Sequence, residues 1–221
     1  TLALGPVNAG SSAVTVVDNL SLAGRGLGGN GALRLMMGAN GANVNGNVDL
    51  VSATRVQADQ AGTFNLNGIW DLDATLTAGG TNFVSFGTTS RVLGANPLVH
   101  YGISGLRLQG NASTYSGPIT SLLGEVRVDF NDPTSGANPY QSVAGLNLRN
   151  TTLQVLLSFG ASAQQNRFSD VAPIVSRGSR IRVENNSFNN STAGQNAVNW
   201  SEVLGTLTLV CLLYTSDAAD E

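Results

Sequence analysis

The feature that most constrains the fold of this chain is the alternation of apolar and polar residues within short segments. Apolar pairs show this alternation at Val14/Val16, Leu20/Leu22, Phe64/Leu66, Val84/Phe86, Leu106/Leu108, Val126/Val128, Leu146/Leu148, Leu153/Val155, Ile181/Val183 and Leu207/Leu209. A period of two places successive side chains on opposite faces of a strand, so that one face can be buried. Clusters of Gly, Asn, Ser and Thr, such as residues 38–43, separate the segments and favour turns. Only residues 33–37 and 156–165 could suit a helix, and both are short, so an all-β fold is expected.

Internal repeats favour one of the two all-β architectures that fit this pattern. A Gly-led strand recurs at residues 62–66, 105–108, 145–148 and 205–209. The segment Leu33-Arg34-Leu35, followed by Gly46 and Val48, is echoed by Leu106-Arg107-Leu108, followed by Gly117 and Ile119. Similar strands stacked in parallel form a solenoid, in which each coil covers its neighbour.

A β-sandwich is the alternative, and it would place hairpin turns between antiparallel strands along the whole chain. The Asn-Gly dipeptides, which are the strongest hairpin signal, all fall in the first third of the chain. Stacked Asn and Thr side chains can form hydrogen-bonded ladders in a solenoid, which suits a chain with only 11% charged residues. The expected architecture is therefore a right-handed parallel β-helix (a β-solenoid).

The C-terminal segment differs from the rest of the chain. Residues 211–221 resemble the in-frame translation of a sequencing-library adapter, a kind of segment that is excluded from fold reasoning. We expect residues 1–210 to be the solenoid repeat region, an internal fragment of a longer protein. Without the last eleven residues the chain loses its only Cys and three of its 14 acids, Asp217, Asp220 and Glu221. The 11 Arg then balance 11 acids, and the net charge is zero.

This composition excludes several function classes. The chain has no Lys and no block of basic residues, so nucleic acid is not expected as a partner. No apolar run approaches the roughly 18 residues of a membrane-spanning helix.

A family resemblance is carried by residues 105–128. Gly105-Leu106-Arg107-Leu108-Gln109-Gly110-Asn111 leads to Tyr115-Ser116-Gly117, then to a Thr-containing strand and to Gly124-Glu125-Val126-Arg127-Val128. This segment resembles the autotransporter-associated β-strand repeat, whose pattern is a Gly-led strand, a Gly-Asn-x-x-Tyr-x-Gly turn, a Thr-rich strand and a closing Gly-led strand. Here the turn has one extra residue between Asn111 and Tyr115. Residues 166–174 and 201–209 also look like the stretch between repeats of that family.

The resemblance implies a function and a location. It implies a β-helical passenger of a bacterial secreted or cell-surface protein, acting as an adhesive or structural stalk, with an outer-membrane barrel elsewhere in the full-length chain. Its partners would be glycans or cell-surface proteins, and the rod would be a monomer. The residues that match the repeat motif would have structural roles: Gly105, Gly110, Asn111, Tyr115, Gly117 and Gly124.

His100 is the first candidate for catalysis, because it is the only imidazole and a Ser-His-Asp triad would require it. Ser104 and Asp129 are near it in sequence, but neither lies in a nucleophile-elbow setting. We expect His100 to be an exposed or turn-packing residue, and no catalytic residue is assigned.

Asp71 and Asp73 are the candidates for a rival function, a carbohydrate-active β-helical enzyme. They flank Leu72, so in a strand both carboxylates face the same way, and glycan hydrolases use paired carboxyl groups. The alternative is that both lie on the solvent face of a strand, opposite Trp70 and Leu72.

The remaining motifs carry no cofactor or metal. Asp129 and Asp132 could bind a cation in a turn, but the nine-residue calcium-repeat signature is absent. Gly24-x-Gly26-x-x-Gly29 formally matches the dinucleotide fingerprint, yet a strand-like segment follows it instead of a helix, so it is interpreted as a solenoid turn.

Surface contacts are expected on loops inserted between coils. Two such loops are Asp129–Tyr140 and Glu184–Trp200. Their aromatic residues Tyr140, Phe188 and Trp200 are the candidate contacts with a partner.

Overall fold

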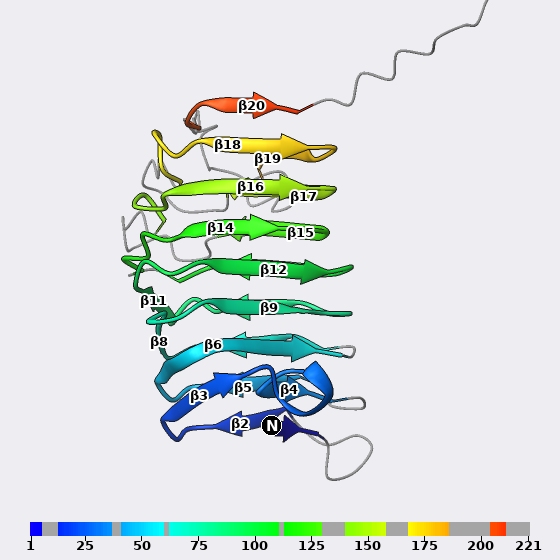
Figure 1. Ribbon diagram of the computed structural model, residues 1–221, viewed down its shortest axis with the longest axis vertical. Coiled ribbons are helices and arrows are strands. Elements are labelled where there is room, and N and C mark those ends of the chain that lie inside the picture. The colour runs from blue at the N-terminus through cyan, green and yellow to red at the C-terminus, as the bar shows by residue number, and fades with distance from the viewer. Residues whose placement is uncertain are drawn as a thin grey trace, which may run out of the picture.

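The computed structural model is an all-β stack of parallel strands (Figure 1). The structure describes residues 1–5, 13–36, 41–59, 62–110, 113–129, 140–157, 168–185 and 204–210. Within these ranges the paired strands are all parallel, and successive strands alternate between two sheets. The chain is therefore a parallel β-helix, and the all-β prediction is confirmed.

One sheet has eight strands, and neighbours in it come from successive coils. Its order from one end to the other is β19 (Arg180–Asn185), β17 (Thr151–Leu157), β15 (Gly124–Asp129), β13 (Gly105–Leu108), β10 (Val84–Phe86), β7 (Phe64–Leu66), β5 (Ala42–Val44) and β2 (Val14–Val16).

The other sheet has twelve strands, and it forks in the early coils. The main path runs through β1 (Leu2–Leu4), β4 (Leu33–Leu35), β6 (Val48–Ala58), β9 (Leu76–Gly80), β12 (Leu98–Gly102), β14 (Pro118–Ser121), β16 (Gly145–Arg149), β18 (Ile174–Arg177) and β20 (Leu207–Leu209). A side branch pairs β3 (Leu20–Gly24) and β8 (Ile69–Asp71) with the first half of β6, and β11 (Arg91–Leu93) with β8. The branch gives the early coils a third face.

The coil length is visible in the register of the strands. Asn43 lies beside Asn65, 22 residues further along the chain. Other coils are longer, with 28 residues between Val14 and Ala42 near the start of the chain and 28 between Thr151 and Ser179 further on. The chain thus adds residues between strands without breaking the stack.

The two Leu-Arg-Leu segments do not occupy equivalent places in the coil. Leu33–Leu35 is β4 of the twelve-stranded sheet, whereas Leu106–Leu108 belongs to β13 of the eight-stranded sheet. Inward-facing residues are apolar on every face of a solenoid, so similar strand sequences arise on different sheets.

The core is the space between the sheets, filled by inward side chains. Trp70 of the twelve-stranded sheet and Phe86 of the eight-stranded sheet pack edge to face, with ring centroids 5.7 Å apart. Burying a side chain of this size stabilises the fold by roughly 1.5–3 kcal/mol. The largest fully buried side chains also include Phe64, Tyr115, Tyr140 and Phe168.

The glycine run of residues 24–29 forms a turn, as expected. It contains a single short 3-10 turn, Leu27–Gly29, and is followed by strand β4. The arrangement lacks the helix that a dinucleotide site of this type requires.

Candidate functional site

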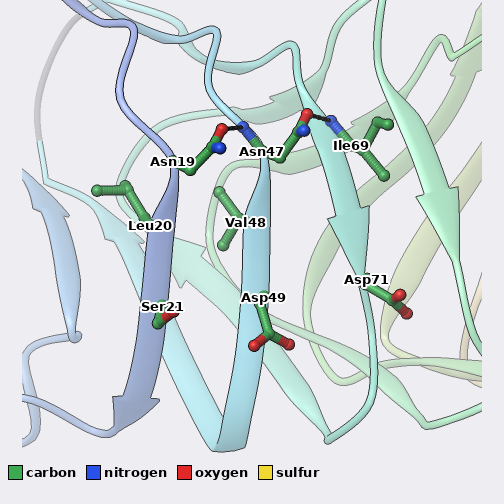
Figure 2. Close-up of a pocket in the computed structure, with 8 residues that line it drawn as sticks. All are labelled: Asn19, Leu20, Ser21, Asn47, Val48, Asp49, Ile69 and Asp71. Carbon is green, nitrogen blue, oxygen red and sulfur yellow. Dashed lines mark hydrogen bonds between the residues drawn. The ribbon is translucent and has the colours of Figure 1, made fainter.

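A shallow groove lies on the outer face of the side branch (Figure 2). Its volume is about 290 Å³, and three neighbouring strands, β3, β6 and β8, contribute its walls. Because these strands are in register, each outward position forms a row that crosses the strands. The lining residues are Asn19, Leu20, Ser21, Asn47, Val48, Asp49, Ile69 and Asp71.

Asparagines form hydrogen-bonded ladders, and one of these ladders edges the groove. The Asn47 backbone N–H donates to Asn19 Oδ1 at 2.9 Å, and the Ile69 N–H donates to Asn47 Oδ1 at 3.1 Å (Figure 2). In the eight-stranded sheet, Asn65 Nδ2 of β7 donates to Asn43 Oδ1 of β5 at 2.9 Å. The ladders expected from the Asn content are present, and their amide groups form hydrogen bonds from one coil to the next.

Asp49 and Asp71 lie side by side in the groove. They are register partners in β6 and β8, so their carboxylates belong to one outward row. Burial raises the pKa of Asp71, and the negative charges of Asp73 and Asp49 raise it further. Two neighbouring carboxyl groups, one of them with a raised pKa, are the starting arrangement for acid–base chemistry.

The expected orientation around Asp71 is observed. Trp70 and Leu72 are fully buried, Asp71 is half-buried and Asp73 is exposed. Asp73 lies beyond the end of β8 and does not line the groove. The structure therefore pairs Asp71 with Asp49, which the sequence did not single out.

A sequence signal for Asp49 does exist. Residues 43–50 read Asn-Val-Asn-Gly-Asn-Val-Asp-Leu, and residues 65–72 read Asn-Leu-Asn-Gly-Ile-Trp-Asp-Leu. The two copies are 22 residues apart, which is the coil length here. This period aligns Asp49 with Asp71 as it aligns Asn43 with Asn65.

His100 is buried, so the expectation that it is an exposed or turn-packing residue is wrong. Its side chain is 1% exposed, inside β12, and burial lowers its pKa to about 4. Nδ1 lies 2.8 Å from the Ser121 hydroxyl oxygen, and the Thr151 hydroxyl donates to the same oxygen at 3.0 Å. The strand register explains this placement, because His100 and Ser121 are partners in β12 and β14 and both point into the core. A substrate has no access to an imidazole buried in this way.

Tyr115 of the repeat-like motif is fully buried. Its hydroxyl accepts a hydrogen bond from the Leu98 N–H at 2.9 Å and lies 2.8 Å from the Pro118 carbonyl oxygen. Gly117 leaves room for that hydroxyl, since a Cβ there would lie 2.5 Å from the oxygen. Tyr115 thus ties three segments of the chain together at this corner.

The other motif glycines lie at close approaches of the backbone. Gly124 has a φ of +81°, and an added Cβ would lie 2.1 Å from the Ser104 carbonyl oxygen. Added atoms would meet the Phe83 ring at Gly105 and the Ser90 carbonyl at Gly110. Asn111 lies outside the described residues.

The candidate surface contacts are only partly within the described chain. Tyr140 is fully buried, which corrects the expectation that it contacts a partner at the surface. It pairs with Phe168 of the next coil in an isolated parallel bridge, and both side chains belong to the hydrophobic core. Phe188 and Trp200 lie outside the described residues, as do most of the two loops that were expected to be inserted between coils.

Other candidate chemistry finds little support in the described part of the chain. No group of three or more His, Cys, Asp or Glu side chains there is placed to hold a metal ion. For the proposed cation site, Asp132 lies outside the described residues, as does the side chain of Asp129. Among the residues that the structure describes, no helix has the length and apolarity needed to cross a membrane.

Comparisons with known proteins add no family to this picture. The chain matched no family model, no curated protein and no solved structure. What the strands and their register establish is the architecture, a parallel β-helix.

Proposed function

We propose that this chain is a repeat-built segment of a bacterial secreted or cell-surface protein, and that it acts as an adhesive or structural stalk. The observation that carries the proposal is the continuous parallel stack, in which main-chain pairing runs from β1 to β20. Such a stack is quasi-one-dimensional, since each coil contacts only its neighbours, and it can extend over any number of coils.

The side-chain chemistry supports a mechanical role. Asn43 and Asn65 bond to each other, as do Asn45 and Asn67, instead of facing a ligand. The single imidazole is buried and bonded within the core. In the described part of the chain, many polar side chains thus form hydrogen bonds between neighbouring coils.

The proposal includes partners and a location. The expected partners are glycans or cell-surface proteins, which bind along the lateral faces of a monomeric rod. The location is extracellular or on the bacterial surface, with an outer-membrane barrel elsewhere in the full-length chain. The resemblance of residues 105–128 to the autotransporter-associated repeat supports this part of the proposal.

The test measures whether the purified protein binds glycans or cells and whether it hydrolyses the glycans that it binds. A glycan array and intact bacterial cells are probed with the labelled protein, and release of reducing sugar is assayed on the glycans that bind. Binding without turnover, together with antibody labelling of unpermeabilised source cells, is the expected result. Cytoplasmic location in those cells would contradict the proposal.

A second function, a carbohydrate-active enzyme, is favoured by one observation. Asp71 lines a groove beside Asp49, and its pKa is raised by burial and by neighbouring acids. Glycoside hydrolysis uses two carboxyl groups, of which the one that acts as general acid has a raised pKa. Release of reducing sugar that is abolished in both Asp71→Asn and Asp49→Asn, but retained in the matched Asp18→Asn variant, would establish the enzyme and overturn the stalk.

A further inference from the structure

Two arginines are held side by side at the corner where the twelve-stranded sheet turns into the eight-stranded sheet. Arg149 ends β16, Arg177 ends β18, and the two are register partners in neighbouring parallel strands. Figure 1 shows β16 and β18 one above the other, pointing the same way. Both side chains are exposed, so two guanidinium groups stand in one row, about one strand spacing of 4.8 Å apart at their Cα atoms.

This arrangement is unfavourable for the folded chain on its own. Like charges directly opposite each other on neighbouring strands are destabilising. Neither guanidinium has a hydrogen bond or an ion pair to another residue in the ranges that the structure describes. Among the described residues, the fold therefore holds two cations together and gains no contact from their side chains.

The corner beneath the arginines is fixed by the backbone. Asn150 and Gly178, which follow Arg149 and Arg177, both have left-handed φ values, 49° and 64°. The Asn150 N–H donates to the Arg177 carbonyl at 2.9 Å, and the Thr151 N–H donates to the Ser179 hydroxyl at 3.1 Å. Successive coils thus turn in the same way, and the two arginines keep their spacing.

Aliphatic side chains continue the row on both sides. Leu122 follows Ser121, the partner of Leu148, and so lies beside Arg149. Val210 follows Leu209, the partner of Ser176, and so lies beside Arg177. Leu122 is 42% exposed and Val210 is 41% exposed, so the row reads apolar, cationic, cationic, apolar at the surface.

We propose that this row, Leu122, Arg149, Arg177 and Val210, is a binding site for an anionic polysaccharide that bears carboxylate or sulfate groups. Guanidinium forks bind such oxyanions through two parallel hydrogen bonds, and the aliphatic ends suit the apolar faces of sugar rings. Arg180, exposed on the far side of the corner, adds positive charge. The row continues past Leu122 to Tyr101, whose ring packs against the Arg55 guanidinium 4.1 Å away and whose hydroxyl donates to Gln57. The row therefore presents no series of free aromatic rings, which favours a glycan over single-stranded nucleic acid, because nucleic acid binds by stacking successive bases on such rings. The site deepens the proposed adhesive function and rests on it.

The test compares the double variant Arg149→Gln/Arg177→Gln with a matched control, Arg25→Gln/Arg91→Gln. The control removes the same charge from two exposed arginines in the early coils. Binding to dextran sulfate, polygalacturonate and uncharged dextran is measured by calorimetry at low and physiological salt. Wild type is expected to bind at least one of the two anionic polymers and not dextran. The corner variant should weaken that binding about tenfold, and the control less than about twofold.

Thermal unfolding supplies a second readout. Because the corner variant removes a like-charge contact, its midpoint should equal or exceed that of wild type. Lost binding with a lowered midpoint would contradict the proposal, because it would point to a structural role for the arginines.

Three further results would overturn the site. They are equal loss of binding in the control pair, absence of wild-type binding to both anionic polymers, and tighter binding of single-stranded DNA with the same dependence on Arg149 and Arg177. Failure of the corner is distinguishable from failure of the stalk proposal. In the first case antibody still labels unpermeabilised source cells, and in the second the protein is found in the cytoplasm.

Discussion

Replacing His100 by Asn should change how the stability of the fold depends on pH. In the folded chain the imidazole is buried, and its Nδ1 faces the Ser121 hydroxyl at 2.8 Å. A neutral imidazole can accept a hydrogen bond from that hydroxyl, whereas a protonated imidazole can only donate. Folding therefore favours the neutral form, and burial lowers the pKa of His100 from 6.5 to about 4.

The sign and size of the effect follow from proton linkage. Between pH 6.5 and 4 the unfolded chain binds a proton at His100 that the folded chain does not, so stability is lost as the pH falls through this window. With these two pKa values, the loss is about 2 kcal/mol between pH 7 and pH 5 and about 3 kcal/mol between pH 7 and pH 4. His100→Asn lacks this titration, although it leaves the same cavity at every pH.

The assay is urea unfolding of wild type and His100→Asn at pH 7, 6 and 5, followed by circular dichroism. Carboxyl groups titrate in both proteins, so the difference between their free energies of unfolding isolates His100. That difference should shift by about 2 kcal/mol in favour of the variant as the pH falls from 7 to 5. A difference that does not change with pH would refute the reasoning.

Three other substitutions test the coil-to-coil contacts. Asn65→Ala removes the ladder bond to Asn43 and should lower the free energy of unfolding by about 0.5–1.5 kcal/mol in urea titrations, and an unchanged value would contradict the ladder. Tyr115→Phe leaves the Leu98 N–H without its acceptor and should cost about 1–3 kcal/mol in the same titrations, whereas a neutral result would mean that the hydroxyl is dispensable. Because burial and the neighbouring acids Asp73 and Asp49 raise the pKa of Asp71, Asp71→Asn should raise the thermal midpoint at pH 7 and raise it much less at pH 3, where Asp is largely protonated. A lower midpoint at pH 7 would show that the carboxylate is stabilised instead.

Much of the fold could be predicted from the sequence because its rules are local. Alternation at Phe64/Leu66 or Leu153/Val155 requires only that one face of a strand be buried, and these segments are strands β7 and β17. The Asn and Gly clusters mark turns for an equally local reason. Assignment of strands to sheets is not local, which is why the similar segments 33–35 and 106–108 lie in different sheets.

The surroundings of each candidate site residue depend on side chains of the neighbouring coil. For that reason the sequence alone did not predict the burial of His100 and Tyr140 or the pairing of Asp49 with Asp71. His100 is buried because Ser121, one coil further, supplies its partner. Tyr140 is buried because it pairs with Phe168 in the next coil. Asp49 stands beside Asp71 because the similar segments 43–50 and 65–72 lie one 22-residue coil apart, a period that the Gly-led strands and the Leu-Arg-Leu segments do not share. Such placements become predictable once the coil length is known.

The central claim, a rod of in-register parallel coils, is tested most directly by distances along one row. Outward positions Thr15, Arg107, Arg127 and Arg182 belong to a single row of the eight-stranded sheet. Spin-label pairs joining residue 15 to residues 107, 127 and 182, in a Cys211→Ser background, are measured by pulsed electron resonance. At about 4.8 Å per strand step, the Cα separations should rise steadily to about 19, 24 and 34 Å. A 15/182 distance no longer than the 15/107 distance, as a β-sandwich would allow, would contradict the account.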